Sequence, residues 1–242
     1  MSDLSFQSPY INGEFRDRRA RRYPTRSERQ REAERRKGPS LWKRPIDVTF
    51  ALAGLIFFAP LLILISLALL ISDNRPIIYR QKRVGMAGRT FECLKFRTMR
   101  RDSDEMLARL LADCPVSAEE WAAARKLSRD PRVHAIGNIL RRSSLDELPQ
   151  LINVLRGEMS LVGPRPIVEA EVAYYGENFF AYQAVRPGIT GLWQVSGRNT
   201  LPYATRVRLD AYYVRQLSLA NDLLILVKTL PIVVLARGDY SK

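Results

Sequence analysis

The sequence predicts an α+β fold, in which a small and mostly helical domain contains a short β-hairpin and is attached to a membrane. Three observations predict it: a long uncharged apolar segment, two short alternating segments that follow it, and Ala-, Leu-, Glu- and Arg-rich segments over most of the remainder. A chain of 242 residues is long enough for one domain with accessory segments. The expected organisation is a basic disordered arm at 1–40, a re-entrant membrane helix-break-helix at 41–74 and a cytoplasmic domain at 75–242.

The positive charge of the chain is concentrated near its beginning. The net charge is +14, and residues 1–45 hold 13 Lys or Arg against 6 Asp or Glu. Such a segment has few apolar residues and is expected to be disordered. Basic arms bind nucleic acid or anionic lipid, but this arm leads directly into an apolar segment, where each cation gains roughly 1 kcal/mol from an anionic leaflet. Membrane lipids are therefore the expected partner, and nucleic acid is not.

The apolar segment runs from Val48 to Ile71 without a charged residue. As a straight helix it would reach about 36 Å, enough to cross a ~30 Å hydrocarbon core. However, Pro60 lies at its middle, where it removes a backbone hydrogen bond. Lys43 precedes the segment and Arg80 follows it, and positive flanks mark the cytoplasmic side. A helix that enters the membrane, breaks at Pro60 and returns satisfies both flanks better than a span.

Two strands are predicted next, at 76–85 and 90–97, with a hairpin turn at 85–88. Lys95 and Arg97 alternate with apolar residues, so both cations should share one face of the second strand. That face is either solvated or part of a binding site. No phosphate-binding glycine motif accompanies the hairpin.

Helices are predicted over most of the rest of the chain. Residues 102–128 read as two helices interrupted at Cys114-Pro115, and 169–184 and 201–219 as one amphipathic helix each. The apolar stretch at 223–235 is interrupted by a lysine and a proline, and it is too short to span a bilayer. We expect it to lie along the membrane interface.

Two adjacent carboxylates, Asp146 and Glu147, precede an apolar run, and 19 residues after the first of them Arg165 stands between two prolines. Ser144 with Glu147 three residues later fits a helix capping box. A capping box explains neither the second carboxylate nor an arginine held between prolines. A functional interpretation therefore stands beside the structural one.

Four motifs occur along the chain in a fixed order: Leu94-Lys-Phe-Arg-Thr-Met99, Ser144-Leu-Asp-Glu-Leu-Pro-Gln150, Gly163-Pro-Arg-Pro166 and the stretch from Arg186 to Asn199. Together they resemble those of the bacterial sugar transferase family, the monotopic phosphoglycosyl transferases that load a sugar 1-phosphate onto undecaprenyl phosphate. The resemblance runs from about Leu41 to Gly238, and a further likeness is to the galactosyl-phosphate transferases of exopolysaccharide synthesis.

The resemblance implies a two-step transfer in a catalytic domain at 75–242. Asp146 would attack the β-phosphate of a UDP-sugar, release UMP and hold a covalent phosphosugar, which undecaprenyl phosphate then accepts. This would be the first step of exopolysaccharide repeat-unit assembly, with galactose as the expected sugar and glucose as the alternative. Glu147 would act either as a general base or as a partner of Mg²⁺.

The composition also points to Mg²⁺ as the metal. The chain has one histidine, His134, and its two cysteines have no metal-type spacing, so a metal must be held by oxygen ligands. Asp146 and Glu147 are the expected ligands. The resemblance implies further groups that bind phosphate or substrate, and these are Arg165, Arg141, Lys95, Arg97, Gln194 and Arg198. Gln194 and Arg198 lie in a glycine-spaced segment, which is either a loop over the nucleotide or a structural turn.

The resemblance places the protein at the cytoplasmic face of the inner membrane, with a homodimer and contacts with downstream glycosyltransferases as further expectations. Two other classes of protein compete with the enzyme. A membrane-anchored nucleic-acid binder would explain the basic arm, and a scaffold of a polysaccharide export complex would explain the membrane segment.

Overall fold

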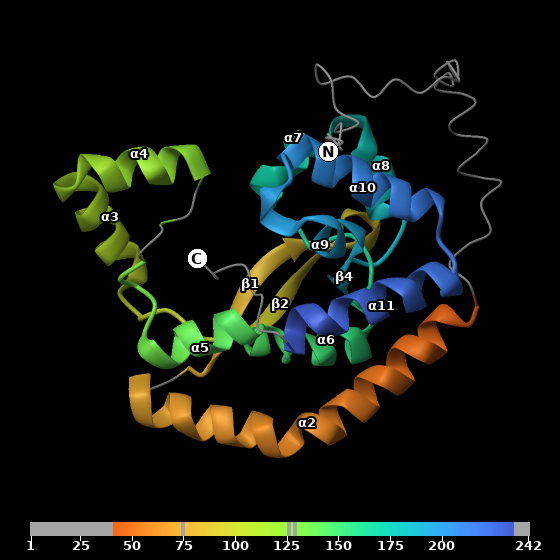
Figure 1. Cartoon of the computed structure of the whole chain (residues 1–242), viewed down its shortest axis with the longest axis horizontal. Coiled ribbons are helices and arrows are strands. Elements are labelled where there is room, and N and C mark those ends of the chain that lie inside the picture. Colours follow the sequence, from red (N-terminus) through yellow and green to blue (C-terminus); the bar gives the residue numbers. More distant parts are fainter. Residues whose placement is uncertain (1–40, 74–75, 125–126, 128–129, 235–242) are drawn as a thin grey trace, which may run out of the picture. The chain divides into compact units, whose positions relative to one another are not determined.

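A computed structural model of the chain describes residues 41–73, 76–124, 127 and 130–234. The basic arm predicted at 1–40 lies outside the described residues. The elements form an α+β domain along which one long helix runs (Figure 1). The helices are α2 (Lys43–Asp73), α3 (Ser103–Asp113), α4 (Pro115–Ala124), α5 (Ala135–Ser143), α6 (Gln150–Arg156), α7 (Val172–Tyr175), α8 (Phe179–Gln183), α9 (Leu192–Ser196), α10 (Tyr203–Arg215) and α11 (Leu219–Val234). The strands are β1 (Ile78–Val84), β2 (Thr90–Phe96), β3 (Ser160–Val162) and β4 (Gly188–Thr190).

The predicted hairpin is confirmed. Strands β1 and β2 pair antiparallel with Gln81 opposite Cys93 and Arg83 opposite Phe91, and a 3-10 turn at Met86–Gly88 joins them. Because side chains alternate across a strand, these four residues and Lys95 share one face. The opposite face of β2 carries the buried Leu94 and Phe96. Both faces of the hairpin therefore contact apolar clusters, and the face with Cys93 also carries the charged Arg83 and Lys95.

Helix α2 is continuous over 31 residues, with Pro60 inside it. The predicted break is therefore a bend: Figure 1 shows α2 curving near its middle, where Pro60 lies by sequence. A proline within a helix removes one hydrogen bond and bends the helix without ending it. The helix is long and apolar enough to cross a membrane, and only 11% of its most apolar window is buried, unlike the core helix of a soluble protein.

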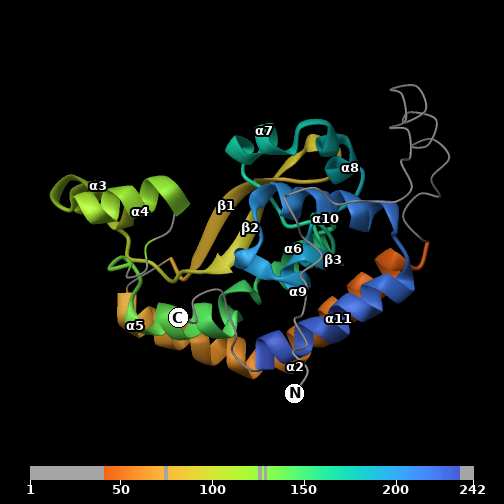
Figure 2. The same ribbon diagram turned by 45° about the horizontal axis from the view of Figure 1, so that its top comes forward.

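Both ends of α2 are attached to the same domain. Near its beginning, Lys43 Nζ lies 2.6 Å from Asp222 Oδ2 in the first turn of α11. Near its end, Ile65 and Leu69 are buried in a cluster with Phe96 of β2 and Leu140 of α5. The helix therefore lies along the domain, as a second view also shows (Figure 2).

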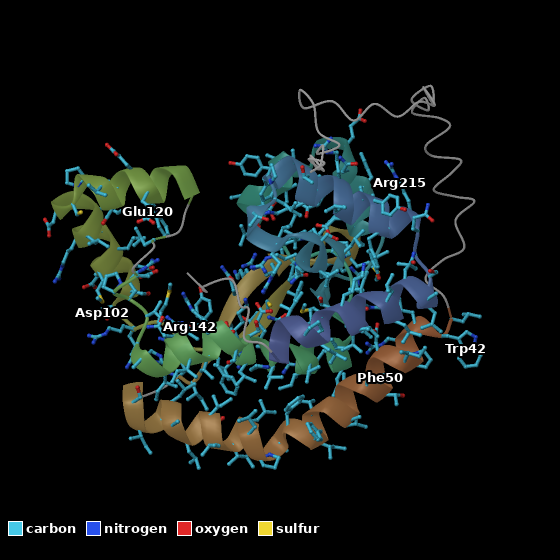
Figure 3. All side chains as sticks on the ribbon, in the orientation of Figure 1. Trp42, Phe50, Asp102, Glu120, Arg142 and Arg215 are labelled. Atoms are coloured by element: carbon cyan, nitrogen blue, oxygen red, sulfur yellow. The ribbon has the colours of Figure 1, made fainter. Side chains whose placement is uncertain are left out.

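A row of apolar side chains lies on the other side of α2. Phe50, Phe57, Leu64 and Ile71 are each more than half exposed, and Figure 3 shows side chains projecting from the side of α2 that faces away from the domain. On α11, Leu224, Val227 and Leu230 are similarly exposed. Exposed apolar surface on this scale marks a membrane or partner interface. Among the described residues, α2 is long and apolar enough to cross a membrane, and α11 adds further exposed apolar side chains.

The second half of the fold differs from the prediction in two respects. Residues 169–184 are not one helix but a succession of short α- and 3-10 helices, and Gly176, with a φ of 48°, separates α7 from the segment that follows. The sequence also did not reveal a parallel pair formed by β3 and β4. At this pair Gly163 approaches Gly188 so closely that a Cβ on either would collide with the other's backbone.

A buried side chain of α6, Asn153, forms hydrogen bonds to the hairpin, beside the apolar contact of Cys93 with Leu151 and Val154. Asn153 is fully buried; its Oδ1 accepts from Leu94 N at 3.0 Å, and its Nδ2 donates to Glu92 O at 2.7 Å and Glu158 Oε2 at 2.6 Å. The amide thus satisfies both backbone groups of β2 that face it. It sets the position of β2 relative to the residues that precede α6.

Replacing Asn153 with Ala should destabilise the folded protein by about 2–4 kcal/mol, because buried backbone groups of Glu92 and Leu94 would lose their partners. The measurement is the thermal unfolding midpoint of purified protein in detergent. Asn138→Ala is the matched control, since Asn138 is an exposed residue of α5. Equal midpoints for the two variants would contradict the proposed joining role.

Candidate functional site

A pocket opens where the hairpin, the segment before α6 and the β3–β4 region meet. Of the residues predicted for the site, it brings together Lys95, Glu147, Arg165 and Gln194. The pocket combines one carboxylate with several cations, which suits a negatively charged substrate. Its lining consists of Arg83, Cys93, Lys95, Glu147, Gln150, Arg165, Pro166, Ile189 and Gln194.

The two carboxylates lie in a 3-10 turn, Leu145–Glu147, between α5 and α6. Ser144 ends α5 in the left-handed conformation with a φ of 57°, and its side chain makes no cap bond. The predicted capping box between Ser144 and Glu147 is therefore wrong. With its side chain not used as a cap, Glu147 is free to reach the pocket.

Glu147 is paired with Lys95. Its Oε1 lies 2.6 Å from Lys95 Nζ, and the two side chains are 23% and 19% exposed. Burial by itself raises the pKa of Glu147, but the charges of Lys95 and Arg165 outweigh burial and hold that pKa below its usual value. Glu147 is thus ionised at neutral pH and carries the negative charge that faces the cations of the pocket.

Asp146 behaves differently from its neighbour. Burial, followed by the charge of Glu147, raises the pKa of Asp146 to about 6, although Lys95 and Arg141 act against this rise. A carboxylate with such a pKa is mostly ionised at pH 7 and is more basic than an ordinary aspartate. Two adjacent carboxylates with pKa values shifted in opposite directions are typical of residues with different chemical tasks.

Arg165 is held on both sides. Gly188 N donates to Pro164 O at 2.8 Å, and Arg83 Nη1 donates to Pro166 O at 2.9 Å. The guanidinium of Arg165 lies 5.9 Å from the centre of the Trp193 ring, a distance at which cation and ring attract. Backbone and side chain are therefore both fixed where the residue lines the pocket.

Gln194 lies on helix α9 rather than in a loop that closes over the site. Its Nε2 donates to Ile189 O at 3.3 Å, which orients the amide, because the opposite orientation would place two acceptors together. Its Oε1 is buried and has no hydrogen-bond partner within the described structure. A buried acceptor at a pocket wall is suited to a donor group of a ligand.

Four predicted residues do not belong to the pocket lining: Asp146, which directly precedes the lining residue Glu147, and three arginines. Arg141 lies nearby, donates from Nε to Thr98 Oγ1 at 2.7 Å, and lowers the pKa of Asp146. Arg97 and Arg198 are not among the lining residues, and Arg97 Nε is buried without a hydrogen-bond partner in the described part of the chain. Arg198 lies in a 3-10 turn after α9.

Sequence reasoning missed Arg83 and Cys93 as pocket residues. Arg83 was one of several cations after the membrane segment, and nothing in that run distinguishes it. The signal that could have found both is the register of the hairpin, which places them on the same face as Lys95. The register of a hairpin is fixed by the type and length of its turn. The sequence did not define this turn to the exact residue, so the register could not be predicted.

The residues at hand fit a magnesium ion in part. Mg²⁺ in phosphate-transfer sites commonly takes one or two carboxylates, with waters and substrate phosphates as its other ligands. Asp146 and Glu147 could supply those carboxylates. Among the residues that the structure describes, no cluster of three or more His, Cys, Asp or Glu side chains could hold a metal alone. A bound phosphate would therefore have to complete the coordination.

Known proteins are similar to this chain over most of its length. The family model described as bacterial sugar transferase matches residues 39–236. The exopolysaccharide production protein ExoY of Sinorhizobium fredii is 50% identical over 198 residues, covering 82% of this chain and 88% of that protein. An undecaprenyl-phosphate galactose phosphotransferase of Salmonella typhimurium is 47% identical over 82% of this chain and 41% of its own length. A UDP-glucose:undecaprenyl-phosphate glucose-1-phosphate transferase of Caulobacter vibrioides is 39% identical over 83% of this chain and 72% of its own. The chain belongs to the bacterial sugar transferase family.

Proposed function

We propose that this enzyme transfers galactose 1-phosphate from UDP-galactose to undecaprenyl phosphate, releasing UMP, as the first step of exopolysaccharide repeat-unit assembly. The relative named for galactose is 47% identical to this chain, and the relative named for glucose is 39% identical. That difference favours galactose. Glucose is the alternative that the assay below distinguishes.

The observation that carries the proposal is the pair Asp146 and Glu147 beside Lys95 and Arg165. Phosphoryl transfer between two anions needs cations around the phosphate and a group that attacks phosphorus. Lys95 and Arg165 line the pocket and provide the positive charge. Asp146, with a pKa raised to about 6, is ionised at neutral pH and basic enough to attack.

In the first step a carboxylate oxygen of Asp146 bonds to the β-phosphorus of the nucleotide sugar. The bond from that phosphorus to the bridging oxygen breaks, and UMP leaves with the electron pair. In the second step an oxygen of undecaprenyl phosphate bonds to the same phosphorus, and the Asp146 carboxylate leaves. Each step exchanges one phosphorus–oxygen bond for another, so no oxidant or reductant is needed.

The other residues position the substrate. Arg165 and Lys95 neutralise phosphate oxygens, and the buried Oε1 of Gln194 accepts from an N–H or O–H of the nucleotide or sugar. An ionised phosphate has no N–H or O–H to donate, so Gln194 Oε1 would not bind the phosphates of the substrate. Mg²⁺, held by Asp146 and Glu147, would neutralise charge on the diphosphate. Glu147 would be either its ligand or a general base.

The membrane arrangement follows from α2. We propose that α2 enters the cytoplasmic leaflet of the inner membrane and returns, bending at Pro60, so that the pocket faces the lipid phosphate from the cytoplasm. Lys43 near one end and Leu69 near the other both contact the same domain. A helix that crossed the bilayer would place these ends on opposite sides of it.

Asp146→Asn should abolish the first step. An amide is a poor nucleophile and forms no acyl phosphate, so the loss should be on the order of 10³-fold or more, or roughly 4 kcal/mol of barrier. The measurement is UMP released in one turnover from UDP-galactose without undecaprenyl phosphate. Glu147→Gln should still release UMP but transfer the sugar phosphate about 10²-fold more slowly.

Asp104→Asn is the control for that experiment, since Asp104 is exposed on α3. A normal burst of UMP from Asp146→Asn would leave a direct transfer in place of the covalent one. A burst with UDP-glucose but not UDP-galactose would reassign the sugar. No turnover of any UDP-sugar would favour the scaffold.

The rate of the UMP burst should fall as the pH is lowered through about 6, because protonated Asp146 cannot attack phosphorus. Since the charge of Lys95 lowers the pKa of Asp146, Lys95→Gln should move this acid limb to higher pH, in addition to slowing the reaction. The exposed Lys82 of β1 provides the control variant Lys82→Gln. An acid limb near pH 4 in the wild type would show that Asp146 is an ordinary aspartate.

Cysteines placed at the two ends of α2 should both be protected from the periplasmic side. Leu41→Cys and Ser72→Cys are suitable because both positions are exposed, with Cys114→Ser as the background and Cys93 buried. A membrane-impermeant maleimide should label each only after the cells are lysed. Labelling of residue 72 in intact cells would mean that α2 spans the membrane.

A further inference from the structure

We infer that Arg83 is a positioning residue for the proposed transfer, which holds the Pro164–Pro166 segment so that Arg165 faces the phosphates of the nucleotide sugar. The inference rests on the proposed function for its substrate. It concerns a residue of the hairpin that lies 82 positions before Arg165 in the chain. Contact between the two regions is brought about only by the fold.

The side chain of Arg83 is almost fully committed to protein partners. It is 12% exposed, and its Nε and Nη2 donate to Gln81 Oε1 at 3.2 and 2.6 Å. Its Nη1 donates to Pro166 O at 2.9 Å and lies 3.7 Å from Glu171 Oε2. Three of its five N–H donors are thus used by Gln81 and Pro166, so the guanidinium is fixed in place, and its bond to Pro166 O lies next to Arg165.

The segment that Arg83 holds contains two prolines. Pro164 and Pro166 have no N–H group, so each can be held by a backbone hydrogen bond only through its carbonyl. Gly188 N donates to Pro164 O, and Arg83 Nη1 donates to Pro166 O. Immediately after them, Val84 N donates to Ile167 O at 2.8 Å. The end of β1 is thus fastened to the chain that follows Arg165.

The charges around Arg83 indicate what the arrangement serves. The pKa of Arg83 is lowered, first by burial and next by the charge of Arg165, so the two guanidiniums repel each other. Holding two like charges beside one pocket costs free energy unless an anion lies between them. Glu147 supplies one negative charge there, and a bound diphosphate would supply more. The hydrogen bond from Arg83 to Pro166 O keeps Arg165 in place against this repulsion when no substrate is bound.

A double-mutant cycle distinguishes this role from a merely structural one. Arg83→Gln should slow the UMP burst by about 10²-fold, the loss expected when a reacting group is misplaced by about 1 Å. In an Arg165→Gln background, the same change should cost less than about 3-fold, because the residue that Arg83 positions is already gone. Arg83→Lys should fall between wild type and Arg83→Gln, since it keeps the charge but cannot bond to Gln81 and Pro166 together.

The same cycle is measured in the affinity for UDP by calorimetry, which needs no turnover. Thermal unfolding midpoints identify any variant that fails to fold. If Arg83→Gln does not fold, Arg83→Lys replaces it in the double-mutant cycle. Lys82→Gln, on the opposite face of β1, is the control. If Arg83→Gln costs the full factor again in the Arg165→Gln background, or leaves burst and affinity unchanged, the inference is wrong. If wild type releases no UMP but the UDP-affinity cycle is non-additive, the proposed function fails and the positioning role stands.

Discussion

The hydrogen bonds from the Asn153 side chain of α6 to the backbone of β2 are the interaction on which the rest of the site depends. One buried amide satisfies Leu94 N and Glu92 O, the backbone groups on either side of Cys93. Because Lys95 follows on the same strand, its ammonium is brought to 2.6 Å from Glu147, which lies six residues before Asn153. A shift of one residue in this contact would turn Lys95 to the apolar face of the hairpin.

Near that contact the pKa values of the two adjacent carboxylates are shifted in opposite directions. Both side chains are partly buried; the charges of Lys95 and Arg165 keep Glu147 ionised, whereas burial and the charge of Glu147 make Asp146 more basic. The charges that achieve this come from three separate regions of the chain: Lys95 from β2, Arg165 from the segment after β3, and Arg141 from α5. The site therefore exists only when the hairpin, α5 and the β3–β4 pair are assembled together.

The membrane helix is part of the same assembly. Lys43 Nζ donates to Val162 O as well as pairing with Asp222, and Val162 ends the strand that leads to Arg165. At the other end of α2, Leu69 packs with Phe96, which ends the strand that carries Lys95. A bent helix lets both contacts form on one side of the domain. The long apolar helix α2 is thus in direct contact with β2 and β3.

The hairpin, the paired carboxylates, the constrained arginine and the long apolar helix could all be predicted from the sequence, because each is specified by residues close together in the chain. Alternating apolar and polar residues predict a strand, and a long uncharged apolar run predicts a helix able to cross a membrane. The sequence did not show that Pro60 bends α2 rather than breaking it, or that Gln194 lies on a helix. Nor did it show that Asp146, Arg97 and Arg198 stay out of the pocket lining, or that Arg83 enters it. Each of these depends on contacts between residues far apart in sequence: the packing of α2 on the domain, the close approach of β3 to β4, and the register of β1 against β2. Local sequence preferences do not predict such contacts, because the stabilising free energy comes from burial and hydrogen bonds that form only when the distant segments meet.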